Sequence, residues 1–243
     1  PDTVETPTAP EPVFTAAPRL RSFDADAPIS IKDDGAARSV TVREFLIGAA
    51  ACELPPDWPD DAIHAQMVAA HSYALSLGGA AFSCSSAQCA GWTNETVLKA
   101  RWGDDFTTYY SRLAALADEV AGAVLCWDGA PAAACYHSIS AGQTEASQNV
   151  WLTAVPYLQG VASPWDTASP GFETAITYSA EQVYSVLAGL GLDADEIENA
   201  PAGWFGEGVL DDAGYVAEMS ICGQTFAGTK LRSAFSLRSA AFS

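Results

Sequence analysis

Apolar residues recur at helical spacing on both sides of one glutamate, Glu53, and predict two helices that flank it. The first is expected to start after Thr41, where Thr41 and Glu44 stand at capping-box spacing, and to end near Cys52. Glu53 is followed by Leu54-Pro55-Pro56, and a residue before proline favours extended backbone. We therefore expect Glu53 at or just past a helix end, where its side chain can be presented to a ligand.

The second predicted helix follows a proline-containing turn. Asp57 is the expected cap, Pro59 is tolerated in the first turn, and Gly78-Gly79 ends the helix. One face carries the apolar residues Ile63, Met67, Ala70 and Ala74, and the polar residues on the helix include Gln66, His71 and Tyr73. This helix therefore supplies both core contacts and candidate ligand-binding groups.

Apolar neighbours would change the chemistry of Glu53. Leu54, Pro55, Pro56 and Trp58 lie close to it in sequence, and desolvation raises the pKa of a carboxyl group. The result would be a proton donor at neutral pH. The alternative is a solvent-facing glutamate near a helix end that has no role, and spacing alone does not decide between the two.

Shorter patterns predict the remaining elements. Alternation within residues 19–40, broken by Asp33-Asp34-Gly35, predicts a β-hairpin ahead of the first helix. The other predictions are helices at 94–102 and 106–121, a strand pair at 124–127 and 132–138 joined by Asp128-Gly129, a strand at 172–178, and a helix opened by a capping box at Ser179. The expected fold class is α+β, with antiparallel strands and hairpins, several helices, and the active-site glutamate at a helix end.

Composition and charge narrow the class of protein. With 243 residues, 49% of them hydrophobic, the chain can bury a substantial core, and we expect one domain at 19–243. A formal net charge of −19 opposes binding to nucleic acid and to anionic membrane surfaces. No apolar run is long enough to span a membrane, and residues 1–18 are expected to be a proline-rich linker left after removal of an upstream segment. We therefore expect an extracytoplasmic protein, secreted or membrane-anchored by a segment that precedes this chain.

Six cysteines, an even number, fit disulfides in an exported protein but do not fix the pairing. Cys84 and Cys89 are the closest pair in sequence. We favour a disulfide between them over a zinc site, because two cysteines with no nearby histidine fall short of the ligands that zinc takes. His137 could arrive from elsewhere in the chain, so zinc stays open, as do buried free thiols.

A second polar segment, residues 136–145 with the sequence YHSISAGQTE, follows the predicted strand pair. Small hydroxyl residues and a glycine give a backbone that can approach a ligand closely and donate hydrogen bonds to it. The simpler interpretation is an ordinary turn. The candidate binding residues here are His137, Ser138, Ser140, Gly142 and Thr144. Downstream, Trp151 and Tyr157 are candidates for stacking on a ligand, with burial as core anchors the alternative.

The residues around Glu53 resemble a known family. Glu53-Leu54-Pro55, Trp58-Pro59 and the run AIHAQMVAAHSYAL at 62–75 are similar to the pattern E-M-P, W-P and E-A-L-K-A-Q-A-V-A-A-R-T-Y-A-L of the SpoIID family. The YHSISAGQTE segment resembles the family's F-H-S-x-S-G-G-x-T. Two departures stand out. His71-Ser72 replaces an Arg-Thr pair, and Ala141 replaces the first of two glycines.

This resemblance implies a lytic transglycosylase that acts on peptide-stripped peptidoglycan glycan strands. Glu53 would protonate the oxygen between N-acetylmuramic acid and N-acetylglucosamine, and then accept the proton of the C6 hydroxyl that closes a 1,6-anhydro ring. A hydrolase would instead be expected to use a pair of carboxylates. No cofactor is implied, and a cell-wall amidase and a membrane partner are candidate partners.

Other functions are weighed against this one. Some relatives resemble non-catalytic modules that bind the wall or enhance an amidase, and the departures at positions 71 and 141 keep that alternative open. His64, His71 and His137 are too scattered for a short metal-ligand motif, and no Gly-x-Ser-x-Gly segment occurs. Metal-dependent and Ser/His hydrolase functions are therefore disfavoured.

Overall fold

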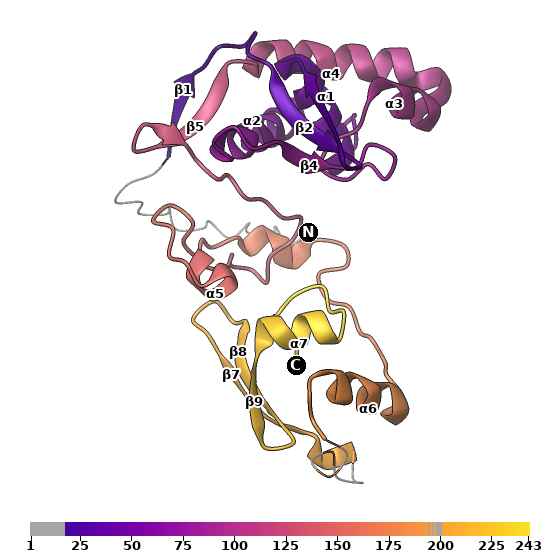
Figure 1. Ribbon diagram of the computed structural model, residues 1–243, viewed down its shortest axis with the longest axis vertical. Helices are drawn as coiled ribbons and strands as arrows, with labels where there is room; N and C mark the ends of the chain where they lie inside the picture. The colour runs from indigo at the N-terminus through magenta and orange to yellow at the C-terminus, as the bar shows by residue number, and fades with distance from the viewer. Residues whose placement is uncertain (1–17, 194, 196, 198–200) are drawn as a thin grey trace, which may run out of the picture. The chain divides into compact units, whose positions relative to one another are not determined.

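The computed structural model describes residues 18–193, 195, 197 and 201–243, and it divides the chain into two compact units (Figure 1). The N-terminal unit ends at Tyr136, and the C-terminal unit runs from His137 to Ser243. The predicted linker at 1–18 lies outside the described residues except for its last position. The two units are described separately, and one domain at 19–243 stays a prediction.

The N-terminal unit contains two three-stranded sheets and four α-helices among its described residues. Its elements in chain order are β1 (Arg19–Ser22), β2 (Ile29–Asp33), β3 (Ala36–Val40), α1 (Val42–Glu53), α2 (Asp60–Ser76), β4 (Phe82–Cys84), α3 (Glu95–Trp102), a 3₁₀ turn (Gly103–Asp105), α4 (Phe106–Val120), β5 (Ala123–Trp127) and β6 (Ala130–Pro131). One sheet has the order β1-β5-β6 and the other β3-β2-β4, in which β2 is antiparallel to β3 and parallel to β4.

Helix α1 is the centre of this unit. Its capping box is formed as predicted, because Thr41 Oγ1 accepts from the Glu44 N–H while the Glu44 carboxylate accepts from the Thr41 N–H. From Val42 to Ala51 the helix is buried on nearly every side, and it packs against α2 and α4. Burial of α1 therefore fixes the position of its C-terminal residue, Glu53.

Strand predictions in this unit were partly right. The hairpin before α1 is β2–β3, with positive φ at Asp34 and Gly35 in its turn, whereas β1 pairs with β5 instead. The strand predicted at 132–138 is wrong, since its described counterpart is only Ala130–Pro131. Cys126 lies opposite Pro131 there, and a proline lacks the N–H that would extend the ladder.

The C-terminal unit is built on an antiparallel meander of three strands. Its elements are α5 (Ser147–Trp151), a 3₁₀ turn (Pro164–Ala168), α6 (Ala180–Gly189), a 3₁₀ turn (Pro201–Gly203), β7 (Phe205–Leu210), β8 (Val216–Ile221), β9 (Gln224–Ala227) and α7 (Gly228–Ala234). Figure 1 shows α7 lying against the sheet of order β7-β8-β9, where it contacts β8 and β9. The capping box at Ser179 is confirmed.

One strand prediction in this unit was wrong. Residues 172–178 form no strand, and the segment is instead anchored at its end by the Tyr178 hydroxyl, which donates to the carbonyl of Phe235. The fold class is α+β, as expected, with helices and mostly antiparallel strands in both units. Within the described residues, no helix has the length and apolar character needed to cross a membrane.

Candidate functional site

Glu53 is the last residue of α1, and Leu54 leaves the helix with extended backbone (φ −126°, ψ 147°). The side chain of Glu53 is exposed, while partial desolvation raises the pKa of its carboxyl group above the ordinary value. Among the described residues, no ion pair engages this carboxylate. Glu53 is therefore an accessible carboxyl group with a tendency to hold its proton.

Arg112 on α4 fixes the loop that follows Glu53. Its guanidinium donates to the carbonyl oxygens of Pro56 and Trp58, the latter at 2.7 Å, and forms an ion pair with Asp60. The predicted cap of α2 is consequently wrong, because the helix starts at Asp60, after Pro59, with no side-chain cap. Asp57 is exposed and does not cap the helix. Arg112, which is far away in sequence, holds this turn instead.

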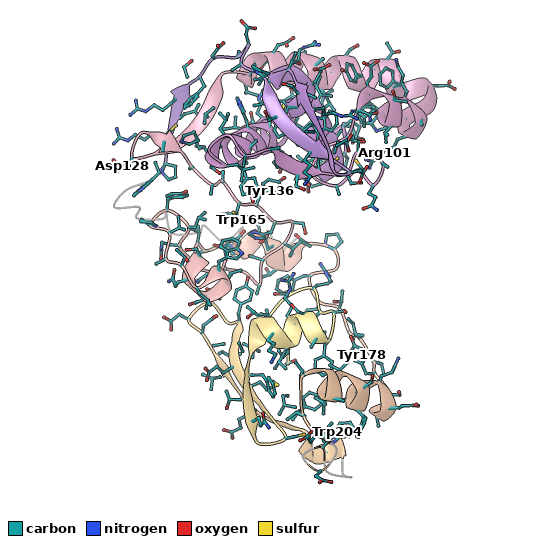
Figure 2. The ribbon with its side chains drawn as sticks, in the orientation of Figure 1. Arg101, Asp128, Tyr136, Trp165, Tyr178 and Trp204 are labelled. Atoms are coloured by element: carbon teal, nitrogen blue, oxygen red, sulfur yellow. The ribbon has the colours of Figure 1, made fainter. Side chains whose placement is uncertain are left out.

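Tyr136 and Gln66 lie beside Glu53. Desolvation raises the pKa of the Tyr136 phenol to about 12, the negative charge of Glu53 adds to that rise, and the neighbouring Gln66 amide opposes it. The Nε2 atom of Gln66 is buried and has no hydrogen-bond partner among the described residues. Tyr136, labelled in Figure 2, is still partly exposed. The three side chains thus combine a carboxyl, a phenol and a buried amide.

Sequence reasoning selected Gln66 but missed Tyr136 as a site residue. The available signal was its place as the first residue of the YHSISAGQTE segment. The sequence did not show that β5 and β6 pack against α2. This packing brings Tyr136, which follows β6, close to Glu53 at the end of α1.

His71 and Tyr73, the other candidates on α2, have different environments. His71 is only 1% exposed, and its ring bonds to the backbone of Ala123. Burial lowers the pKa of this histidine, although the bond to Ala123 opposes the effect. Tyr73 is half-buried and packs edge-to-face on Phe82 at 6.2 Å between ring centroids. His71 therefore belongs to the core, while Tyr73 keeps some exposed surface.

In the C-terminal unit, Asp166 organises the serine-containing loop. Its Oδ2 accepts from the backbone N–H of Ser140 at 2.8 Å and from the Ser140 hydroxyl at 2.6 Å. Desolvation acts to raise the pKa of Asp166, but the bonds from Ser140 outweigh it and hold the pKa below the ordinary value. Ser140, 5% exposed, is thus a structural anchor of the loop.

Gly142 and Thr144 also shape this loop. Gly142 has φ +97°, a conformation that favours glycine, whereas Ala141 is not among the residues with positive φ. The Thr144 hydroxyl accepts from the N–H of Val161 at 2.9 Å. Tyr215 lies directly before β8. Its hydroxyl accepts from the Ala141 N–H and donates to the Gln143 carbonyl at 2.8 Å.

The remaining candidates of this unit are more accessible. His137 and Ser138 are exposed, and Tyr157 is half-buried. Trp151, which ends α5, is 55% exposed and therefore does not serve as a core anchor. The candidate residues form two groups, one on each unit: Glu53, Gln66, His71 and Tyr73 in the N-terminal unit, and His137 through Tyr157 in the C-terminal unit.

The predicted bond between Cys84 and Cys89 is not formed, and both carry free thiols. Cys84 Sγ points to the carbonyl of Lys32, whereas Cys89 Sγ lies 2.8 Å from Cys52 Sγ. No group of three or more His, Cys, Asp or Glu side chains suited to a metal ion occurs in the part of the chain that the structure describes.

Comparison with known proteins gives a family match. Residues 32–127 match the family model described as "SpoIID: Stage II sporulation protein". The chain is 28% identical, over 245 aligned positions, to the stage II sporulation protein D of Bacillus subtilis (strain 168), an alignment that covers 96% of this chain and 68% of that protein. It is 26% identical to the protein of the same name in Bacillus amyloliquefaciens, with 93% and 67% covered.

A third relative carries a different name. Over 138 aligned positions, the chain is 28% identical to the "Amidase enhancer" of Bacillus subtilis (strain 168). That alignment covers 57% of this chain but only 17% of the enhancer. The likeness is thus confined to a small part of that larger protein.

Proposed function

Because residues 32–127 of this chain match the SpoIID family model, we propose that the protein is a cell-wall lytic transglycosylase. Its substrate would be the glycan strand of peptidoglycan from which the stem peptides have been removed. The bond cleaved would be the one between N-acetylmuramic acid and N-acetylglucosamine, and the product would carry a 1,6-anhydro-N-acetylmuramic acid end. The protein would act outside the cytoplasm, where this polymer lies.

Glu53 would supply both proton transfers. As a neutral acid it protonates the glycosidic oxygen, and as a carboxylate it then takes the proton of the C6 hydroxyl that attacks the anomeric carbon. No water enters the reaction, so a second carboxylate to activate water is unnecessary. The substrate N-acetyl group can stabilise the cationic transition state.

The observation that carries the proposal is the state of Glu53. The carboxyl group is exposed at a helix end, is free of ion pairs within the described residues, and has a raised pKa through desolvation. An ordinary surface glutamate in an ion pair would be held as the carboxylate and would be a poor proton donor. Glu53 has the opposite environment.

Groups for sugar binding accompany it. The buried Gln66 amide lacks a partner among the described residues and can donate to a sugar oxygen, with Tyr73 and Tyr136 beside it. From the C-terminal unit we propose His137, Ser138 and the backbone at Gly142 as polar contacts, and Trp151 and Tyr157 as stacking rings. Ser140 and Thr144 would hold the loop, and His71 would support α2 from within the core.

The decisive experiment compares the wild type with Glu53→Gln on peptide-free glycan strands. We expect the wild type to release anhydromuramic ends, detected by mass spectrometry, and the variant to lose at least about 10²-fold in rate because it cannot transfer protons. Glu181→Gln, an exposed glutamate on α6, is the matched control and should leave the rate unchanged. Equal product from wild type and Glu53→Gln would remove Glu53 from the mechanism.

The similarity to an amidase enhancer favours a second candidate function, a non-catalytic module that binds the wall or stimulates an amidase. The same experiment separates the two functions. Glycan binding without anhydro product from the wild type, together with faster turnover of an added cell-wall amidase, would support the module and exclude the transglycosylase.

A further inference from the structure

Two cysteines far apart in sequence meet directly beside the candidate site. Cys52 occupies the last turn of α1, one residue before Glu53, and Cys89 lies in the segment between β4 and α3. Their sulfur atoms are 2.8 Å apart, which is closer than the van der Waals radii of two unbonded sulfur atoms allow. A small side-chain movement would bring them to the disulfide bond length of about 2.05 Å.

The surroundings hold both partners in place. Arg101 on α3, labelled in Figure 2, donates through Nη1 to the carbonyl of Ala51 at 3.1 Å and to the sulfur of Cys89 at 3.2 Å. It therefore links the end of α1 to Cys89.

The segment that carries Cys89 is fixed from the other side. The buried carboxylate of Asp33, at the end of β2, accepts from the N–H and the hydroxyl of Ser86 at 2.7 and 2.8 Å. The Thr93 hydroxyl donates to the Ser86 carbonyl, and Ser85 pairs with Ala90 across the intervening turn. The sulfur of Cys89 is thus delivered to Cys52 by a well-ordered turn.

The pair is also accessible to a reagent. Both cysteines are half-buried, and an open cavity of about 610 Å³ reaches them. Its lining residues are Cys52, Ala87, Gln88, Cys89, Val97, Ala100 and Arg101. A small disulfide compound, or the exposed disulfide of an oxidising protein, can therefore approach the two sulfur atoms.

We propose that Cys52 and Cys89 are an oxidisable pair that forms a disulfide, tying the end of α1 to the segment between β4 and α3. One cysteine thiolate attacks an external disulfide and releases its first sulfur as a thiol. The second cysteine then attacks the mixed disulfide and releases the other. The two protein thiols lose two protons and two electrons, and one external disulfide becomes two thiols.

Burial raises the pKa of the Cys52 thiol. The pairing differs from the bond between Cys84 and Cys89 that sequence proximity favoured. It concerns the covalent state of the protein and holds whether or not Glu53 is catalytic.

The test is to oxidise the whole chain with glutathione disulfide, block the remaining thiols, and cleave it with a protease specific for glutamate. Cleavage after Glu44, Glu53 and Glu95 places Cys52 in one fragment, 45–53, and both Cys84 and Cys89 in another, 54–95. We expect these two fragments joined, lighter by two hydrogen atoms than their sum, and separated again by dithiothreitol. Oxidation should also raise the melting temperature by about 5–10 °C.

Single variants identify the partners. Cys84→Ser should leave the joined fragments unchanged, whereas Cys89→Ser should abolish them. A link that persists in Cys89→Ser, or a closed bond between Cys84 and Cys89 within fragment 54–95, would overturn the proposal. So would full recovery of both residues as blocked thiols, or as two separate glutathione adducts. Protection of the pair by a stoichiometric zinc ion would overturn it as well.

Discussion

At the scale of single residues, the candidate acid depends on where a helix ends. The sequence predicted this end correctly, because Pro55 forces Leu54 into extended backbone whatever the rest of the fold does. It did not predict the cap of α2 or the neighbours of Glu53. Arg112 and Tyr136 reach this region from elsewhere in the chain, and neither contact leaves a pattern near Glu53 in the sequence.

The raised pKa of Glu53 predicts a cost to folding. The folded state binds the proton of this carboxyl group more tightly than the unfolded state, so Glu53 should reduce stability as the pH rises from about 4.3 through its raised pKa. Between about pH 4 and pH 7, the wild type should lose stability relative to Glu53→Gln, measured by urea denaturation. A constant difference across this range would contradict the desolvation of Glu53.

His71 predicts the opposite dependence on pH. Burial lowers the pKa of this histidine, so the unfolded state takes up a proton first as the pH falls through about 6.5, and the folded state loses stability. From about pH 7.5 to about pH 5.5, the denaturation midpoint should fall more in the wild type than in His71→Gln. Parallel profiles of the two proteins would contradict the burial of this histidine.

At the scale of elements, α1 packs unusually closely against the segment that contains Trp92 and Thr93. An amphipathic pattern does not predict such a contact. Trp92 Nε1 donates to the carbonyl of Glu44 at 3.1 Å, and a Cβ atom on Gly48 would lie 2.2 Å from the carbonyl oxygen of Thr93. Helical spacing predicted α1 but gave no role to Gly48, and a glycine inside a helix normally costs stability relative to alanine. The structure shows that the missing side chain is what allows the approach.

Gly48→Ala should therefore destabilise the protein, although alanine normally favours a helix. The new methyl group must displace the backbone of Thr93 or the indole of Trp92, which we expect to lower the free energy of unfolding by about 1–3 kcal/mol. Gly189→Ala in α6 is the matched control, since nothing lies within 4 Å of its added methyl group. That variant should gain up to about 1 kcal/mol. Equal effects in urea denaturation would refute the close approach.

At the scale of the whole molecule, the chain consists of two units with separate cores, and each holds one group of the candidate residues. Local patterns predicted most helices, because capping boxes and periodicity are read within a few residues. The pairing of β1 with β5 and the meeting of Cys52 with Cys89 could not be predicted, since each joins positions remote in sequence and leaves no local pattern.

The N-terminal unit should fold alone. Its core includes residues from α1, α2, α3, α4 and β2, and β1 finds its partner β5 within the same unit. A fragment of residues 18–136 should melt in one cooperative transition by circular dichroism, yet release no anhydromuramic ends, because the proposed sugar contacts after residue 136 are missing. Anhydro product from this fragment would confine the function to the N-terminal unit.

The hydroxyl of Tyr215 contacts the loop at two points, through one bond to the Ala141 N–H and another to the Gln143 carbonyl. A single oxygen just before the central strand β8 therefore couples the hairpin β7–β8 to a segment some seventy positions earlier in the chain. Laboratory evolution aimed at a new sugar preference should accordingly sample the hairpin tip around Asp211 and Gly214 as well as the loop. Changes there can reshape the loop while leaving its own sequence untouched.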